Sequence, residues 1–96
     1  MFEDAVAVLR SWLGEPVIVV LEPDGTVMEG ALSELDSEGT DGALFAVDAE
    51  HTTGVAIALF RDAIGAVETP GEGELVIRQG RVTVRVTCAG RRSGPA

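Results

Sequence analysis

The stretch that decides the fold reads Val55-Ala56-Ile57-Ala58-Leu59-Phe60-Arg61-Asp62-Ala63-Ile64-Gly65-Ala66-Val67-Glu68. Its first half places Val55, Ile57 and Leu59 on one face at a period of two, with small alanines between them. The charged step Arg61-Asp62 separates a second apolar run, so we expect two short strands, over residues 55–60 and 64–67. A strand without charge or proline aggregates when it forms a bare sheet edge. Something must therefore pair with residues 55–60 or cover them.

The composition indicates one small domain with many tight turns. The 96 residues are 46% hydrophobic but only 4% aromatic, and the 12 glycines are typical of a small β barrel. A chain of this length buries somewhat over ~60% of its unfolded surface without metals or disulfides. Cys88 is the single cysteine, the acidic N-terminus does not resemble a secretory leader, and no run approaches the ~20 apolar residues of a membrane span. We therefore expect a cytoplasmic protein without a membrane segment.

An N-terminal helix is predicted by one apolar stripe at helical spacing. The stripe consists of Phe2, Val6, Leu9 and Leu13. Trp12 lies beside it and is expected to pack in the core or in an interface. Gly14 suits a left-handed C-cap, and Pro16 prevents the helix from continuing. A helix of about 12 residues needs tertiary support, so it should lie on the barrel.

A bent hairpin follows the helix. Residues 17–21 are rich in β-branched side chains, residues 22–25 have turn chemistry, and residues 26–36 form the return strand. Gly30 in the middle of that strand indicates a sharp bend or a close backbone approach. A third strand is expected over residues 43–47.

The chain shows no convincing metal, cofactor or catalytic motif. Residues 36–42 are acidic and glycine-rich, but the sixth position is Asp41 rather than glycine and no glutamate stands at the twelfth, as a calcium loop requires. His51 is the only histidine, which excludes triads and multi-histidine metal sites. Cys88 has no activating group nearby in sequence. We expect neither a metal, a cofactor nor an enzyme.

The C-terminal section reads as a second hairpin. A turn-rich connector at residues 69–73 leads into strands 75–78 and 81–87, which flank a two-residue turn at Gln79-Gly80. In that register Arg78 and Arg81 lie opposite each other, a repulsive pair unless an anion or carboxylate bridges them. The period of two places Leu75, Ile77, Val82, Val84 and Val86 on one face, so this hairpin should dock on the barrel. Residues 89–96 are expected to form a frayed tail.

Two motifs resemble those of bacterial Sm-like proteins. Gly25-Thr26-Val27-Met28-Glu29-Gly30-Ala31-Leu32-Ser33-Glu34-Leu35-Asp36 resembles the first motif, and Phe60-Arg61-Asp62-Ala63-Ile64 resembles the second motif of the Hfq branch. The resemblance covers about residues 1–68. It implies a mainly β fold, a small five-stranded SH3-like barrel with an N-terminal helix, to which residues 69–88 add a hairpin. It also implies rings in which the fourth and fifth strands pair between neighbouring subunits, and site residues at Asp36, Phe60, Arg61 and Asp62.

Departures from the family pattern affect the expected function. Asp62 replaces the family histidine at an RNA-contact position, and Ala43 stands where many Sm proteins have an asparagine that contacts a base. We therefore expect an oligomeric Sm-like scaffold or protein-binding module without family-type RNA binding. The alternative is an RNA-binding protein that uses Arg61 and C-terminal arginines such as Arg78 and Arg81.

Charge is distributed unevenly along the chain. Residues 1–50 carry a net charge of −11 and residues 51–96 a net charge of +2, which together give −9. The acidic half repels phosphate, whereas opposite halves of neighbouring copies attract. Two partners could satisfy the backbone of residues 55–60: strand 64–67 of a neighbouring subunit, which gives a closed ring, or the chain's own C-terminal hairpin, which gives a capped monomer.

Overall fold

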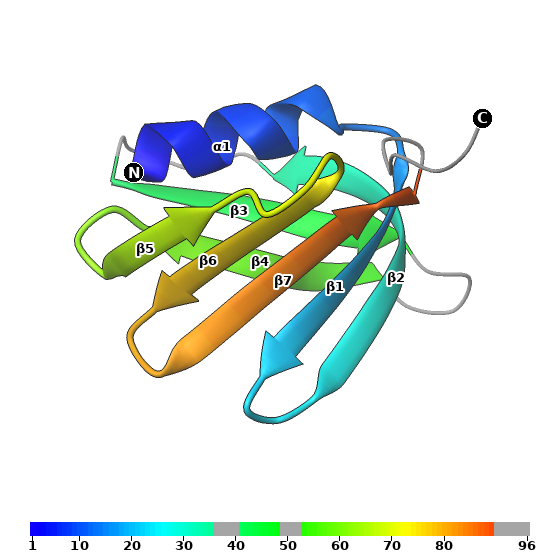
Figure 1. Cartoon of the computed structure of the whole chain (residues 1–96). Coiled ribbons are helices and arrows are strands. Elements are labelled where there is room, and N and C mark those ends of the chain that lie inside the picture. The colour runs from blue at the N-terminus through cyan, green and yellow to red at the C-terminus, as the bar shows by residue number, and fades with distance from the viewer. Residues whose placement is uncertain (36–40, 49–52, 90–96) are drawn as a thin grey trace.

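The computed structural model describes the backbone of residues 1–35, 41–48 and 53–89, and the side chains of these residues except 53–56. These described residues form one helix, α1 (Phe2–Ser11), and seven strands. The strands are β1 (Pro16–Glu22), β2 (Thr26–Leu35), β3 (Gly42–Asp48), β4 (Thr53–Phe60), β5 (Ile64–Glu68), β6 (Glu74–Gln79) and β7 (Val82–Cys88). The predicted mainly β fold with an N-terminal helix is confirmed (Figure 1).

The seven strands form a single antiparallel sheet with the order β4-β3-β2-β1-β7-β6-β5. Two meanders, β1–β4 and β5–β7, are joined where β1 pairs with β7. The hairpin β6–β7 therefore lies inside the sheet, between β1 and β5, rather than being added to a finished barrel. The expected five-stranded barrel with a separate hairpin is not confirmed.

Strand length and alternation explain why β7, and not β5, pairs with β1. β7 has seven residues and β5 only five, so β7 matches the seven residues of β1 along nearly their full length. In that register the apolar side chains of the two strands face the core in pairs: Val17 with Cys88, Val19 with Val86, and Leu21 with Val84. The partner that offers the longer row of core-facing pairs is favoured because cross-strand packing stabilises a sheet.

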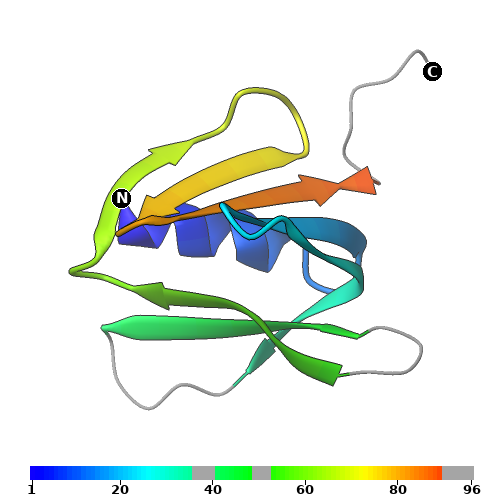
Figure 2. The ribbon, with the colours of Figure 1, turned by 90° about the horizontal axis from the view of Figure 1, so that it is seen from below.

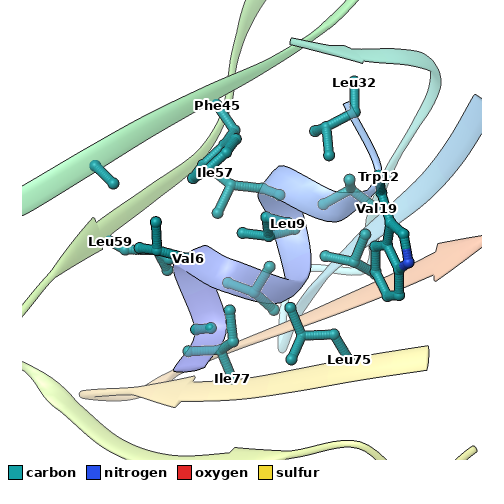
Figure 3. Close-up of a cluster of buried hydrophobic side chains, with 14 of the residues drawn as sticks. Val6, Leu9, Trp12, Val19, Leu32, Phe45, Ile57, Leu59, Leu75 and Ile77 are labelled. Carbon is teal, nitrogen blue, oxygen red and sulfur yellow. The ribbon is translucent and has the colours of Figure 1, made fainter. Parts of the chain in front are cut away.

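The sheet bends back on itself and α1 lies across the opening. Figure 2 shows β5–β7 in one layer and β3–β4 in the other, with the helix between them, and α1 contacts β5 and β6. Leu9 and Val6 project from the helix into the core, among side chains from both layers (Figure 3). All buried side chains among the described residues are apolar. The core thus comes from valine, leucine and isoleucine supplied by both layers and the helix.

The helix is shorter than its apolar stripe suggests. It ends at Ser11, with Trp12 as C-cap, and Leu13 is 40% exposed, so the prediction that Leu13 belongs to the buried stripe is wrong. Trp12 is buried in the core. Gly14 has a φ of 84°, the left-handed conformation expected after the helix end. Its N–H donates to the carbonyl of Leu32 (2.8 Å), which ties the helix end to β2.

Gly30 occupies a position where the backbone of β3 approaches closely. A Cβ atom at residue 30 would lie 2.1 Å from the carbonyl oxygen of Asp48. Contacts below about 3.0 Å do not occur for real Cβ atoms, so only glycine fits without a backbone shift. The predicted close approach in β2 is confirmed.

The turn of the C-terminal hairpin differs from the expected one. Gln79 pairs with Val82 and Arg78 with Thr83, so the turn residues are Gly80 and Arg81. The prediction that Arg78 and Arg81 face each other is therefore wrong. Gly80 has a φ of 61°, and this left-handed conformation is readily adopted only by glycine, which explains why the turn centres one residue later than expected.

Candidate functional site

The two edge strands of the sheet are consecutive in the chain and meet at one corner. Within the described residues β4 pairs only with β3, and β5 pairs only with β6. Residues 61–63 form the turn between them, closed by a hydrogen bond from the Ala63 N–H to the Phe60 carbonyl (3.0 Å). The C-terminal hairpin pairs its backbone with β1 and β5, so no strand in the described ranges pairs with the outer edge of β4. This corner brings together three of the predicted site residues: Phe60, Arg61 and Asp62.

A side-chain amide occupies part of the β4 edge. The Phe60 N–H donates to Oε1 of Gln79 (2.7 Å), and Nε2 of Gln79 donates to the carbonyl oxygen of Ala58 (2.8 Å). Gln79 ends β6 and lies on the same face as Leu75 and Ile77, by the two-residue period of a strand. Sequence reasoning assigned Gln79 to a turn and missed this role. The glutamine in an otherwise apolar core-facing row was the available signal.

Arg61 contacts groups from two distant segments, the start of α1 and the residue before β3. Its backbone N–H donates to the Asp41 carbonyl (2.8 Å), and its guanidinium forms an ion pair with Glu3 and lies 3.8 Å from Oδ1 of Asp41. The guanidinium carbon is also 4.6 Å from the centroid of the Phe2 ring, within range of a cation–π contact. Arg61 therefore fastens the start of α1 and the start of β3 to the β4–β5 turn.

The Glu3–Arg61 pair shifts the pKa of both groups. The hydrogen bond from Arg61 holds the pKa of Glu3 below its ordinary value, with a further contribution from a backbone N–H. The hydrogen bond to Glu3 likewise raises the pKa of Arg61, which stays charged at all accessible pH. Each charged form is stabilised by its partner, which is the expected behaviour of a hydrogen-bonded ion pair.

A pH dependence follows from this pair. Because the folded-state pKa of Glu3 is lowered, its contribution to stability is present above the unfolded pKa of ~4.3 and is lost as pH falls through the folded value. We expect Glu3→Gln to lower the melting temperature at pH 7, and the difference from wild type to shrink as the pH falls below ~4.3 and through the lower folded-state pKa of Glu3. Melting curves at a series of pH values measure it. Glu29→Gln, at an exposed position of β2, is the control and should leave the melting temperature near that of wild type. An equal loss for Glu3→Gln at all pH values would contradict the prediction.

Phe60 is exposed beside two partly buried apolar side chains. Phe45, Ile57 and Leu59 face the core, so the alternating residues Leu44, Ala58 and Phe60 lie on the outer face of β3 and β4. The Phe60 side chain is 54% exposed, and Asp62 next in the turn is also exposed. The three other aromatic side chains of the protein, those of Phe2, Trp12 and Phe45, are buried.

The remaining predicted site residues do not join this corner as one basic patch. Arg78 is exposed on β6, and its Nη1 lies 3.8 Å from a carboxylate oxygen of Glu68 on β5. Arg81 is exposed in the β6–β7 turn. Asp36 lies outside the described residues, as do His51 and most of the acidic stretch considered as a calcium loop.

The described part of the chain contains no cluster of three or more histidine, cysteine, aspartate or glutamate side chains arranged to hold a metal ion. Cys88 is buried at the end of β7, paired with Val17. No helix in the described ranges is long and apolar enough to cross a membrane.

No family model, curated protein or solved structure matches the chain, and none of these comparisons identifies the Sm-like family.

Proposed function

We propose that the protein is an oligomeric scaffold or protein-binding module that associates through the edge strands β4 and β5. The observation that carries this proposal is that both edges of the sheet belong to consecutive strands and lack a strand partner among the described residues. An apolar edge such as that of β4 is a template for pairing with another chain. Pairing of β4 with β5 of the next copy is head-to-tail and closes into a ring when the rotation allows it.

The order of elements supports a relationship to Sm-like barrels. An N-terminal helix precedes the four-strand meander β1–β4, and the last strand returns to pair with β1. The long strand β2 contains a glycine, Gly30, where the β3 backbone approaches closely. We propose that the sheet is an enlarged form of the five-stranded barrel, in which β6 and β7 lie between β5 and β1. In this proposal the described motif residues, 25–35 and 60–64, correspond to the positions that the family resemblance implies.

The geometry favours protein partners over RNA. Arg61, the basic residue of the second motif, is bound to Glu3 and Asp41 and covers the Phe2 ring, so its charge is already partly neutralised. Only Phe60 among the aromatic residues is exposed for base stacking, and the net charge of −9 opposes phosphate. In keeping with this, we propose a non-enzymatic protein of the cytoplasm that works without a cofactor.

Size-exclusion chromatography with light scattering tests the proposal. A mass of about five to seven chains is expected from the family resemblance and supports a ring; a single species of 10.0 kDa would refute it. Ala58→Pro is the matched variant. The Ala58 carbonyl accepts from Gln79 and so points away from β3, and the N–H of the same strand residue points the same way. Proline at position 58 therefore removes a donor from the outer edge of β4 but leaves the hydrogen bonds between β3 and β4 in place. A ring assembled through β4 should dissociate, and absorbance at 260 nm in the same run reports bound nucleic acid.

A further inference from the structure

The Gln79 side chain takes the place of a peptide group from a neighbouring strand. In a parallel ladder one residue accepts a hydrogen bond from the N–H of residue i+1 and donates to the carbonyl of residue i−1 on the adjacent strand. The Gln79 amide accepts from Phe60 and donates to Ala58, which are the residues on either side of Leu59. A side chain thus satisfies the β4 edge in the manner of a strand.

This amide determines which part of the β4 edge is open. β4 runs from Thr53 to Phe60, and Gln79 occupies the donor and acceptor at its C-terminal end. An added strand can pair with the N-terminal part and leave Gln79 in place, or it can pair through Phe60 and displace the amide. β5, with five residues, is short enough for either position on the eight residues of β4.

The C-terminal end of β4 carries exposed apolar surface that a partner strand could cover. Phe60 is 54% exposed there, and Leu44 and Ala58 lie beside it on the same outer face. A partner strand that covers this face gains apolar burial in addition to backbone hydrogen bonds. Pairing at the position that Gln79 blocks would therefore cover this exposed apolar surface.

We infer that Gln79 is a displaceable internal cap on the β4 edge, which opposes pairing of β4 with β5 of a second copy of this chain. The inference rests on the proposed self-association and adds its regulation. In the free chain the amide satisfies Ala58 and Phe60; in the assembly the neighbouring strand does so, and the amide is released to solvent. Each association event consequently includes the loss of two internal hydrogen bonds.

Removal of the cap should strengthen association. Gln79→Met keeps the length and most of the volume of the side chain but cannot replace the amide as donor and acceptor. A typical net hydrogen bond corresponds to a factor of about 2 to 12, so the loss of two competing bonds raises the association constant roughly 5- to 150-fold. The free variant should also melt at a lower temperature, because the Phe60 N–H and Ala58 carbonyl lose their internal partner.

The experiment compares wild type, Gln79→Met and Gln79→Asn by sedimentation equilibrium over a wide concentration range. Asparagine remains polar but is one methylene too short to span both atoms, so it provides a second uncapped chain if the methionine variant folds poorly. The double variant Gln79→Met/Ala58→Pro lacks an outward backbone donor on β4. Its association constant should therefore not show the increase expected for Gln79→Met alone. Arg81→Gln, in the neighbouring turn, is the surface control and should associate like wild type.

The outcomes separate this inference from the proposed function. If the variants associate more tightly than wild type and Ala58→Pro reverses the effect, the cap is supported, whether or not wild type itself assembles. If wild type assembles and the uncapped variants assemble equally well with a lower melting temperature, Gln79 is only a structural closure of the corner and the inference is overturned. If all chains remain monomeric at every concentration, both the cap and the proposed assembly are refuted.

Discussion

Gly30→Ala is expected to lower the free energy of unfolding by about 3 kcal/mol or more. The added methyl group would lie 2.1 Å from the carbonyl oxygen and 2.7 Å from the carbonyl carbon of Asp48, both of which are backbone atoms. A flexible side chain could rotate away, but a strand backbone cannot move without disturbing its ladder. The methyl group therefore forces β2 and β3 apart where Leu32 pairs with Val47, both of which face the core.

Gly65→Ala is the matched control for this substitution. Gly65 also lies in a strand, but a Cβ there would have its nearest neighbour, the Arg78 carbonyl oxygen, at an ordinary 3.8 Å. Its effect should stay within about 1 kcal/mol. Urea denaturation followed by circular dichroism measures both variants. Equal stabilities for Gly30→Ala and wild type would show that β2 and β3 do not approach as closely as the structure indicates.

Local features of the fold could be predicted from the sequence because they depend on short-range chemistry. The period-two pattern of residues 55–60 predicted a strand whose residues Ile57 and Leu59 face the core, and both are buried. Gly30 could be assigned to a close approach because a glycine within a long strand has few other uses. The helix and the left-handed conformation of Gly14 beyond its end follow equally local rules.

The pairing of distant strands could not be predicted in the same way. A period of two determines which face a residue occupies but not which strand lies beside it. The C-terminal hairpin illustrates this: its register differs from the expected one by two residues, yet Leu75, Ile77, Val84 and Val86 still face the core. Because of the same ambiguity, the strand pattern was compatible with a five-stranded barrel closed by β5. In the structure β7 lies beside β1 instead.

The candidate site was predicted in part. The second motif identified Phe60, Arg61 and Asp62, which share the β4–β5 corner. The partners of Arg61 could not be foreseen, because Glu3 is 58 positions away in the sequence and approaches only when α1 lies across the sheet opening. Gln79 was missed because it was assigned to the turn, and its place in the core-facing row of β6 does not show which distant strand its amide binds.

Phe45→Ala is expected to lower the free energy of unfolding by about 3–5 kcal/mol, a large share of the stability of a domain this small. Phe45 is fully buried between α1 and the β3–β4 layer, close to Ile57 in the core (Figure 3). Its removal leaves a cavity that neighbouring side chains from two layers and the helix can only partly fill. The decrease in the free energy of unfolding therefore has two contributions: the lost hydrophobic transfer free energy of the buried ring, and the cost of the cavity that remains.

Phe60→Ala is the control that separates core packing from surface function. The same residue type at the end of β4 is 54% exposed, so its truncation should change the stability of the free chain by only about 0.5 kcal/mol. The association constant should fall markedly, in contrast to the stability. Phe60 supplies apolar surface at the edge where the proposed partner strand pairs. Denaturation at low concentration and light scattering at high concentration give the two readouts. A Phe60→Ala chain that assembles as well as wild type would place the contact between subunits elsewhere, whereas weakened assembly with unchanged stability would locate it at the end of β4.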